Sequence, residues 1–530
     1  MRRASSTGVT ESIRPARLSF PRNQLFNGAL MNSFPDTPPV SSERLIDGNA
    51  RSIDEHYQIV QEYQDDYKPT SIYRLSAEND PVLIERKIVS TPYKPGYPPL
   101  DYLIFTTGDS ADTIRVHCPQ AQLIVDINHE RYLINPASPE QRLIIRTGAG
   151  PDRVTVDEQV KIQVIVETAD GDDVIHSEGS DTQIHAGPGD DFITTGGGKA
   201  YIEAGEGNDM IFVEGDATVY GGAGNDHISA TASLDDSRHL FNGGQGNDLL
   251  IGGRGHSILS GNDGDDSILA GVGSNTIYTG AGRDTVMLIK PTDQVFSNDP
   301  RDQLFQAAPQ PPADAEELRV HASSAEGFQI TLLSNLSLEQ TGIVVNGSPE
   351  FLDRVNDDLR LIGGSPRGSQ LLSVLNKTAK EQGIAVAINP LDYERNALFL
   401  VNAQAPGDPY IRDTRAGDRL PGGSIHYNPA VEIDATPGVV VLYHELCHVY
   451  NRVTGTSFPG DGFDGPRDDK STHRVPNEEL QAIGLPAETR PFDFDADPST
   501  PPLDSNPTPF TENGLREELG LAPRAWVKPR

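Results

Sequence analysis

The sequence is poor in aromatic residues, in cysteines and in long apolar runs, and each shortage excludes a class of protein. Aromatic residues make up 6% of the 530 residues, whereas Gly (51) and Pro (41) are plentiful, which favours short strands and turns over packed helices. The two cysteines, Cys118 and Cys447, are too few for a disulfide framework. No run approaches the ~18 apolar residues of a membrane span, so we expect no membrane insertion.

Basic residues are also scarce, with 43 Lys and Arg against 77 Asp and Glu and a net charge of −34. This charge would repel nucleic acid and anionic membranes, so cations are the expected partners. The polar, Ser- and Arg-rich start, MRRASSTGVTESIRPARLSF, lacks the apolar core of a cleaved secretory signal. We therefore expect a soluble chain that is not exported by such a signal.

Changes in composition predict a multidomain chain in which a parallel β-roll or β-solenoid precedes an α+β domain. The leader is expected to be flexible, with one short helix around Asp54 to Tyr63. Helical spacing in SPEFLDRVNDDLRLI and GSQLLSVLNKTAKEQG indicates helices in the last domain. The expected segments are a leader that could hold a secretion signal (1–70), an N-terminal cap of the solenoid (71–101), the solenoid (102–289), a linker (290–325) and the C-terminal domain (326–530).

Glycine-rich turns that end in aspartate recur through the predicted solenoid, as in AGEGNDMIF and GGAGNDHIS. Successive aspartates are 18, 17, 22, 18 and 18 residues apart, which is about two nonapeptides, and TASLDDSRHLF accounts for the long interval. Weaker units surround Asp112, Asp152 and Asp173. The aspartates of the clear units are Asp191, Asp209, Asp226, Asp248, Asp266 and Asp284.

These units resemble the GGxGxDxUx nonapeptides of repeats-in-toxin proteins, whose parallel β-roll binds calcium in its turns. An aspartate every ~18 residues places the acidic turns along one edge of the roll. Carboxylate and carbonyl oxygens are the ligands that Ca²⁺ prefers, so we expect several calcium ions in one column. The alternative is a solenoid in which the Asp and Asn side chains only cap turns.

The segment VVVLYHELCHVYN contains an HExxH motif formed by His444, Glu445 and His448. On a helix the two histidines lie one turn apart on the same face, with the glutamate beside them. Apolar residues flank the motif, and buried histidines and a glutamate would be costly without a metal. The motif predicts one catalytic Zn²⁺ with Glu445 as the general base, and the alternative is a core helix whose histidines are only hydrogen-bonded.

A catalytic zinc site needs a third protein ligand. A histidine six residues after the second one is absent, because Thr454 occupies that position. The preferred candidate is Glu479 in VPNEELQAIGLP, which would make the domain a gluzincin-like zincin, and Glu478 is the alternative. Asp461 and His473 are weaker possibilities. The second electrophile that stabilises the transition state is not evident, and Arg490 and Tyr427 are the candidates.

From residue 341 to the C-terminus the chain resembles the NleD-like zinc metallopeptidases that bacteria inject into host cells by type III secretion. The resemblance rests on LYHELCHVYN, NEELQAIGLP and the tail TENGLREELGLAPR. It implies one zinc ion, a small gluzincin-like fold and cleavage of a host signalling protein. NleD-like members cut stress-activated kinases, so a host kinase is a possible substrate here. The nonapeptide repeats are not part of that family pattern.

Three functions follow from these expectations. The first is a secreted zinc endopeptidase, translocated into the host cytosol by type III secretion. The second is a calcium-stabilised extracellular protease exported by type I secretion, and the third is a β-roll scaffold or adhesin with an inactive zincin domain. The order of the domains and the Ser-rich leader favour the first, although a host cytosol is poor in calcium. The sequence leaves the oligomeric state open.

Overall fold

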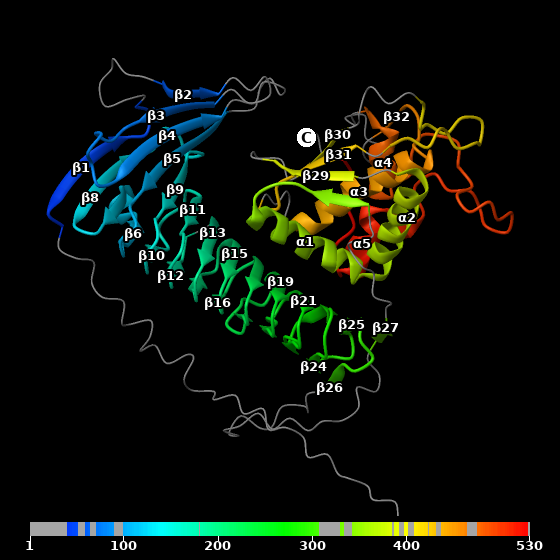
Figure 1. Cartoon of the computed structure of the whole chain (residues 1–530), viewed down its shortest axis with the longest axis horizontal. Coiled ribbons are helices and arrows are strands. Elements are labelled where there is room, and N and C mark those ends of the chain that lie inside the picture. Colours follow the sequence, from blue (N-terminus) through cyan, green and yellow to red (C-terminus); the bar gives the residue numbers. More distant parts are fainter. Residues whose placement is uncertain are drawn as a thin grey trace, which may run out of the picture.

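The chain forms a long β-solenoid followed by an α+β domain that lies beside the later turns of the solenoid (Figure 1). This arrangement comes from a computed structural model. Within its described residues, no helix combines the length and apolar character that a membrane crossing requires. The structure describes residues 40–50, 59–63, 70–89, 99–179, 181–306, 329–332, 342–383, 386–391, 397–400, 407–421, 423–430, 436–463 and 474–527.

Two sheets form the solenoid, and in its repeating part successive strands alternate between them. The 13 strands of sheet A are, in spatial order, β1 (Ser42–Asp47), β8 (Glu130–Asn135), β7 (Leu123–Ile127), β6 (Thr113–His117), β10 (Arg153–Val156), β12 (Val174–Ser177), β14 (Phe192–Thr195), β16 (Met210–Val213), β18 (His227–Ser229), β20 (Leu249–Ile251), β22 (Ser267–Leu269), β24 (Thr285–Leu288) and β26 (Gln303–Gln306). The 14 strands of sheet B are β2 (Ile59–Tyr63), β3 (Thr70–Arg74), β4 (Leu83–Val89), β5 (Leu100–Thr106), β9 (Arg142–Arg146), β11 (Val164–Glu167), β13 (Asp181–Pro188), β15 (Lys199–Glu206), β17 (Ala217–Ala223), β19 (Arg238–Gln245), β21 (His256–Asp263), β23 (Ser274–Tyr278), β25 (Gln294–Ser297) and β27 (Gln329–Leu332).

Aliphatic residues from equivalent positions stack in register inside the solenoid. In sheet B, Ile184 pairs with Ile202, and in sheet A, Ile193 pairs with Ile211, all fully buried. Each such side chain contributes roughly 1.5–3 kcal/mol through burial. The sheet B ladder continues through Val219, Phe241, Leu259, Ile277 and Val295. The repeat therefore builds one continuous core, as the nonapeptide pattern predicts.

The turns of the solenoid require glycine where successive backbones approach closely. Gly224 has a φ of +142°, and a Cβ at this position would collide with the carbonyl oxygen of Gly207 in the preceding turn. Only glycine tolerates both the positive φ and this contact. At the N-terminal end of the solenoid the strands pair differently. There β3, β4 and β5 pair antiparallel, as do β6, β7 and β8, and these strands close the first turns.

The C-terminal domain combines a four-stranded sheet with helices, as the sequence predicts. The sheet has the order β28 (Ile343–Val345), β29 (Val386–Pro390), β31 (Ser424–Tyr427) and β30 (Ala397–Leu400). The described α-helices are α1 (Pro349–Gly363), α2 (Pro366–Gln382), α3 (Gly438–Thr454), α4 (Asn477–Ile483) and α5 (Glu512–Glu518). Shorter elements are β32 (Asp461–Phe463), β33 (Arg474–Pro476), and the 3-10 turns η2 (Pro119–Ala121) and η4 (Thr508–Phe510).

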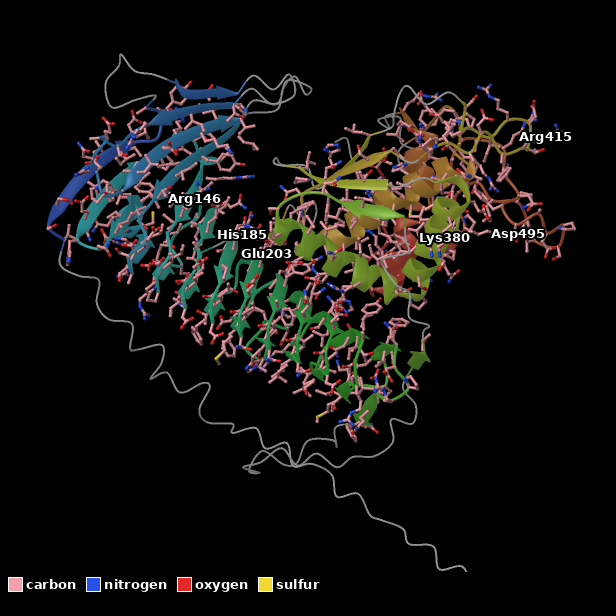
Figure 2. The ribbon with its side chains drawn as sticks, viewed as in Figure 1. Arg146, His185, Glu203, Lys380, Arg415 and Asp495 are labelled. Carbon is pink, nitrogen blue, oxygen red and sulfur yellow. The ribbon has the colours of Figure 1, made fainter. Side chains whose placement is uncertain are left out.

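The solenoid and the C-terminal domain share a hydrophobic core. Aromatic residues on the outer face of sheet B, including Tyr201, Tyr220 and Tyr278, are buried in one cluster with residues of α1, α2 and α3. In Figure 2, His185 and Glu203 lie on the side of the solenoid that faces α1. Glu203 approaches Arg354 of α1 to 3.7 Å. The solenoid therefore completes the core of the second domain.

A buried ion pair lies at the centre of this contact. Arg354 Nη1 is 2.9 Å from Asp358 Oδ1, and their side chains are 4% and 0% exposed. Tyr220 of the solenoid and Tyr427 of β31 both donate hydrogen bonds to the Asp358 carboxylate, at 3.1 and 2.7 Å. The guanidinium of Arg354 also stacks on the Tyr220 ring. The pair joins the two domains because its partners come from both.

The structure corrects the predicted ends of the solenoid. Strand β1 falls in the expected flexible leader and pairs in parallel with β8, while β2 occupies 59–63, where a helix was expected. Strands β25 and β26 fall in the expected linker and continue the two sheets, and β27 adds a strand to sheet B within the expected C-terminal domain. Pairing with a neighbouring strand stabilises these short segments, and composition does not report it. The rest of the expected helix and most of the expected linker lie outside the described residues.

Candidate metal centre

Helix α3 carries the HExxH motif inside the C-terminal domain. The helix is buried along almost its whole length because apolar residues surround the motif, and it ends at Gly455 with a φ of +73°. His444 and His448 are 2% and 8% exposed. Their Nε2 atoms face each other 3.1 Å apart, since a spacing of four places both rings on one helical face.

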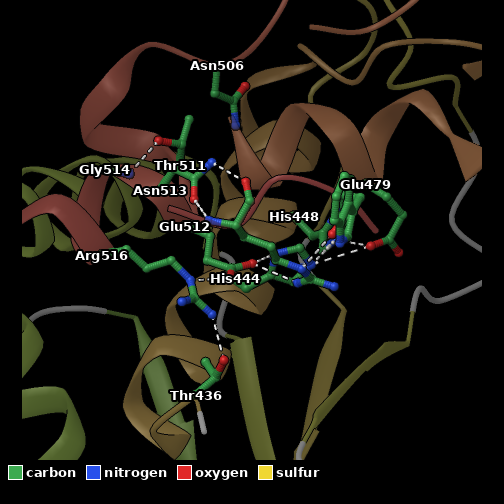
Figure 3. A network of polar contacts seen from close by, with 12 residues as sticks. Thr436, His444, His448, Glu479, Asn506, Thr511, Glu512, Asn513, Gly514 and Arg516 are labelled. Atoms are coloured by element: carbon green, nitrogen blue, oxygen red, sulfur yellow. Dashed lines mark hydrogen bonds and ion pairs between the residues drawn. The ribbon is translucent and has the colours of Figure 1, made fainter. Parts of the chain in front are cut away.

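Helix α4 brings Glu479 to the two histidines (Figure 3). Its Oε2 lies 3.4 Å from His444 Nε2 and 3.8 Å from His448 Nε2. Gln481 of α4 holds the helix in place, because its side chain donates to the carbonyl of Thr456, just after α3, at 2.7 Å. The three ligand-type atoms therefore come from two helices tied together next to the site.

The separations among these three atoms fit a tetrahedral zinc ion. Bonds of about 2.0–2.1 Å in a tetrahedron place neighbouring ligand atoms about 3.3 Å apart. The observed separations are 3.1, 3.4 and 3.8 Å. Two imidazoles and one carboxylate are also the donor set of a zinc site with one coordination position left open. The residues present therefore fit this metal.

The electrostatics of the cluster favour a cation. Burial alone would lower the pKa of His444, but Glu479 and Glu512 raise it to about 9. Without a metal, a proton on His444 would balance these two carboxylates. Glu445 follows His444 on the helix and is 1% exposed, so a further buried carboxyl group lies next to this histidine in the chain.

A second carboxylate contacts the other side of His444. Glu512, the first residue of α5, places Oε2 3.0 Å from His444 Nδ1, and its side chain is 2% exposed. Arg516 Nε and Arg524 Nη1 donate to this carboxylate at 2.7 and 2.9 Å. Arg516 also donates to Thr436 at 2.6 Å, just before α3 (Figure 3). This network connects the C-terminal tail to helix α3, which carries the HExxH motif.

The other candidate residues lie in different surroundings. The three-residue cluster found among the described residues includes neither Glu478 nor Asp461, and Asp461 is exposed in β32. Arg490 is exposed, and the Tyr427 hydroxyl is bound to Asp358 in the contact between the domains. Their roles as transition-state stabilisers stay predictions. His473 lies outside the described residues.

The six repeat aspartates form a column along one edge of the solenoid. They are 0–2% exposed, and each Oδ1 accepts a backbone N–H from the equivalent aspartate one turn earlier. Each Oδ2 is buried without a hydrogen-bond partner among the described residues. Burial raises the pKa of these carboxyl groups to between about 6 and about 8.

The surroundings of Asp266 show how oxygens meet at this edge. A Cβ on Gly261 would collide with both Asp266 Oδ2 and the carbonyl oxygen of Thr279. The missing side chain thus leaves room for two hard oxygens to approach one place, which is the donor chemistry that calcium prefers. The same ladder extends to Asp302, which accepts the N–H of Asp284 at 2.9 Å.

Fold and site together define a repeat β-roll joined to an α+β domain with a metal-type cluster. Residues 339–526 match the Peptidase_M91 family, described as effector protein. Segments 165–193, 178–211, 213–235, 242–277 and 252–286 match the RTX calcium-binding nonapeptide repeat. No curated protein and no solved structure matches the chain. The two resemblances inferred from the sequence are confirmed, and they support a secreted effector peptidase that acts on protein.

Sequence reasoning missed two features of these sites. Glu512 lies in the tail motif TENGLREELGL, but nothing in that motif tells which side chain its carboxylates meet. Asp302 stands 18 residues after Asp284, so the period itself could have found it, although the glycines of the repeat are absent there.

Proposed function

We propose that the protein is a zinc-dependent endopeptidase in which His444, His448 and Glu479 hold the metal. The observation that carries this proposal is the triangle of two imidazole nitrogens and one carboxylate oxygen, with sides of 3.1–3.8 Å, on buried helices. The match of residues 339–526 to a peptidase family supports it independently. The arrangement corresponds to a gluzincin, with an HExxH helix and a glutamate on a second helix.

The chemistry follows from the residues around the metal position. Zinc bound there supplies a Lewis acid and lowers the pKa of its water toward ~7. Glu445 accepts a proton from the attacking water and delivers it to the leaving amine. Its burial protects this proton transfer from bulk water. Glu479 supplies a negative charge to the site, and its place on α4 keeps it near the histidines through the Gln481 contacts.

Two neighbouring glutamates offer a matched test. Glu479→Ala should lower zinc content from near one per chain to well below it, whereas Glu478→Ala should bind zinc normally. Glu445→Ala should keep the zinc and lose roughly 10²–10⁴-fold in cleavage rate, measured on host-lysate proteins. If the wild-type chain binds no zinc, or if the Glu445→Ala variant stays active, the proposed zinc-dependent mechanism is wrong. Zinc binding without any cleavage would instead favour the scaffold or adhesin.

The proposed substrate is a host signalling protein, and a stress-activated kinase is the first one to test. This proposal rests on the effector family rather than on a described substrate groove. Cleavage products of host lysate should be compared between the wild type and Glu445→Ala. A product that appears only with the wild type identifies the substrate and the cleaved bond, while an uncut kinase rejects that candidate alone.

We also infer that Asp191, Asp209, Asp226, Asp248, Asp266 and Asp284 bind calcium. The buried Oδ2 atoms have no hydrogen-bond partner in the described part of the chain, which supports this inference because a cation would neutralise them. They also favour the second candidate function, an extracellular protease exported by type I secretion, since calcium is abundant outside cells. If the roll stays folded and the peptidase stays active at the low calcium concentration of a host cytosol, the result supports type III delivery. A roll that unfolds at such calcium levels favours the extracellular enzyme.

A further inference from the structure

The tail motif ENGLREELGL contributes a residue to the metal centre that the proposed function does not use. Its Glu512 lies on the far side of His444 from Glu479, with Oε2 3.0 Å from His444 Nδ1. The carboxylate is 2% exposed and sits more than sixty residues after the histidine in the chain. Burying a carboxylate beside a histidine of the metal cluster costs free energy unless hydrogen bonds or opposite charges offset the loss of hydration.

The position of Glu512 determines which nitrogen of His444 can bind a metal. A neutral imidazole carries its hydrogen on one nitrogen and offers a lone pair on the other. A carboxylate next to Nδ1 accepts that hydrogen, so Nε2 is left with the lone pair and points toward His448 and Glu479. The same contact fixes the plane of the ring and makes Nε2 a stronger electron-pair donor to a metal ion.

Two arginines hold the Glu512 carboxylate in this orientation. Arg516 Nε donates to Oε1 at 2.7 Å, and Arg524 Nη1 donates to Oε2 at 2.9 Å. Arg524 is itself fixed by its backbone N–H, which donates to Asn513 Oδ1 at 2.6 Å. Arg516 donates to Thr436, which lies just before α3. The arginines therefore balance the charge of Glu512 and connect its helix to the helix that carries His444.

We propose that Glu512 is a positioning residue for the metal centre, which orients His444 through Nδ1 and is held in turn by Arg516 and Arg524. The inference rests on the proposed zinc site. It gives the tail a role within that site: α5 supplies a carboxylate behind the first histidine, while α4 supplies the carboxylate in front of it.

The test measures zinc affinity in the full-length protein, by competition with a chromophoric chelator. Glu512→Gln keeps the shape of the side chain and should weaken zinc binding about 10-fold, and Glu512→Ala should weaken it by up to about 100-fold. Glu512→Asp should recover part of the affinity. Glu517→Gln is the control, because Glu517 lies on the same helix with a side chain that is 72% exposed. Circular dichroism checks that each variant is folded.

A second readout separates positioning from mere stability. The absorption bands of the cobalt-substituted protein report ligand geometry, so they should shift in Glu512→Gln and stay unchanged in Glu517→Gln. If Glu512→Gln fails to fold, Arg524→Met removes one of the two arginines and should weaken zinc binding several-fold.

Wild-type affinity and an unchanged cobalt spectrum in folded Glu512 variants would overturn the inference while leaving the zinc enzyme intact. Absence of zinc binding by the wild-type chain would overturn both proposals.

Discussion

Replacing Asp266 by asparagine should have opposite effects on the stability of the solenoid with and without calcium. Asp266 is 1% exposed, its Oδ1 accepts the N–H of Asp248, and its Oδ2 has no partner among the described residues. Burial raises its pKa from 3.8 to about 8. The metal-free folded state therefore binds a proton more tightly than the unfolded chain. This contribution is fully present below about pH 4 and is lost as the pH rises through about 8.

The magnitude follows from the raised pKa. A difference of about 4 pKa units at ~1.4 kcal/mol each sets a ceiling of about 6 kcal/mol for the ionised carboxylate. Water at the edge of the roll, and the competing ionisation of Asp248 and Asp284, reduce this value. We expect Asp266→Asn to raise the free energy of unfolding of the metal-free protein by about 2 kcal/mol at pH ~8, and by less at pH ~5.

Calcium should reverse the sign. The amide oxygen of asparagine can keep the hydrogen bond from Asp248, but its NH₂ group replaces Oδ2, the oxygen that would bind the proposed calcium ion. The variant should therefore gain less stability from calcium than the wild type, and become the less stable of the two at saturating calcium.

The assay is chemical denaturation of the full-length chain, followed by circular dichroism, with chelator or with millimolar calcium at both pH values. Asp265→Asn is the matched control, because Asp265 is the exposed neighbour and its Oδ1 accepts the N–H of Arg283. It should change stability by less than about 0.5 kcal/mol. A destabilised metal-free Asp266→Asn at pH ~8, or an equal calcium response in both proteins, would refute the argument.

Three further substitutions test the described contacts by the same denaturation assay. Arg354→Ala leaves the fully buried Asp358 without its ion-pair partner and should cost about 3 kcal/mol; a loss below about 1 kcal/mol would contradict a charged pair there. Tyr427→Phe removes one hydrogen bond to Asp358 and should cost about 1–2 kcal/mol. If it lowers the cleavage rate without changing stability, Tyr427 stabilises the transition state instead. Gly224→Ala should destabilise the roll by more than about 3 kcal/mol, since its Cβ would meet the backbone of Gly207.

The period of the glycine- and aspartate-rich repeats predicts the central solenoid, and the HExxH motif predicts the helix that carries His444 and His448. An aspartate every 18 residues and a buried aliphatic position in each strand are local signals, because every turn repeats the same contacts. The HExxH motif is local as well, since four residues on a helix bring His444 and His448 together. The strands at the two ends of the roll lack these signals. They form because a neighbouring strand offers unpaired backbone groups, as β8 does for β1.

The contact between the domains could not be predicted, because it depends on which face of sheet B remains open. Tyr201, Tyr220 and Tyr278 stand at outward positions of their strands, and outward aromatic residues on a solenoid are a signal of a docked partner. The sequence does not tell whether that partner is another chain or the next domain. Nor does it pair Arg354 with Asp358, since two charges in an amphipathic helix ordinarily face solvent.

Helix α5 connects this contact between the domains to the metal centre. Glu512 at its first position meets His444, and Glu518 at its last position accepts a hydrogen bond from Tyr278 of the solenoid at 2.9 Å. Glu518 also accepts the backbone N–H of Arg367 at 3.2 Å. A seven-residue helix is too short to be stable alone, so its placement depends on these contacts at both ends. The position of Glu512 behind His444 therefore depends in part on the contact that α5 makes with Tyr278 of the solenoid.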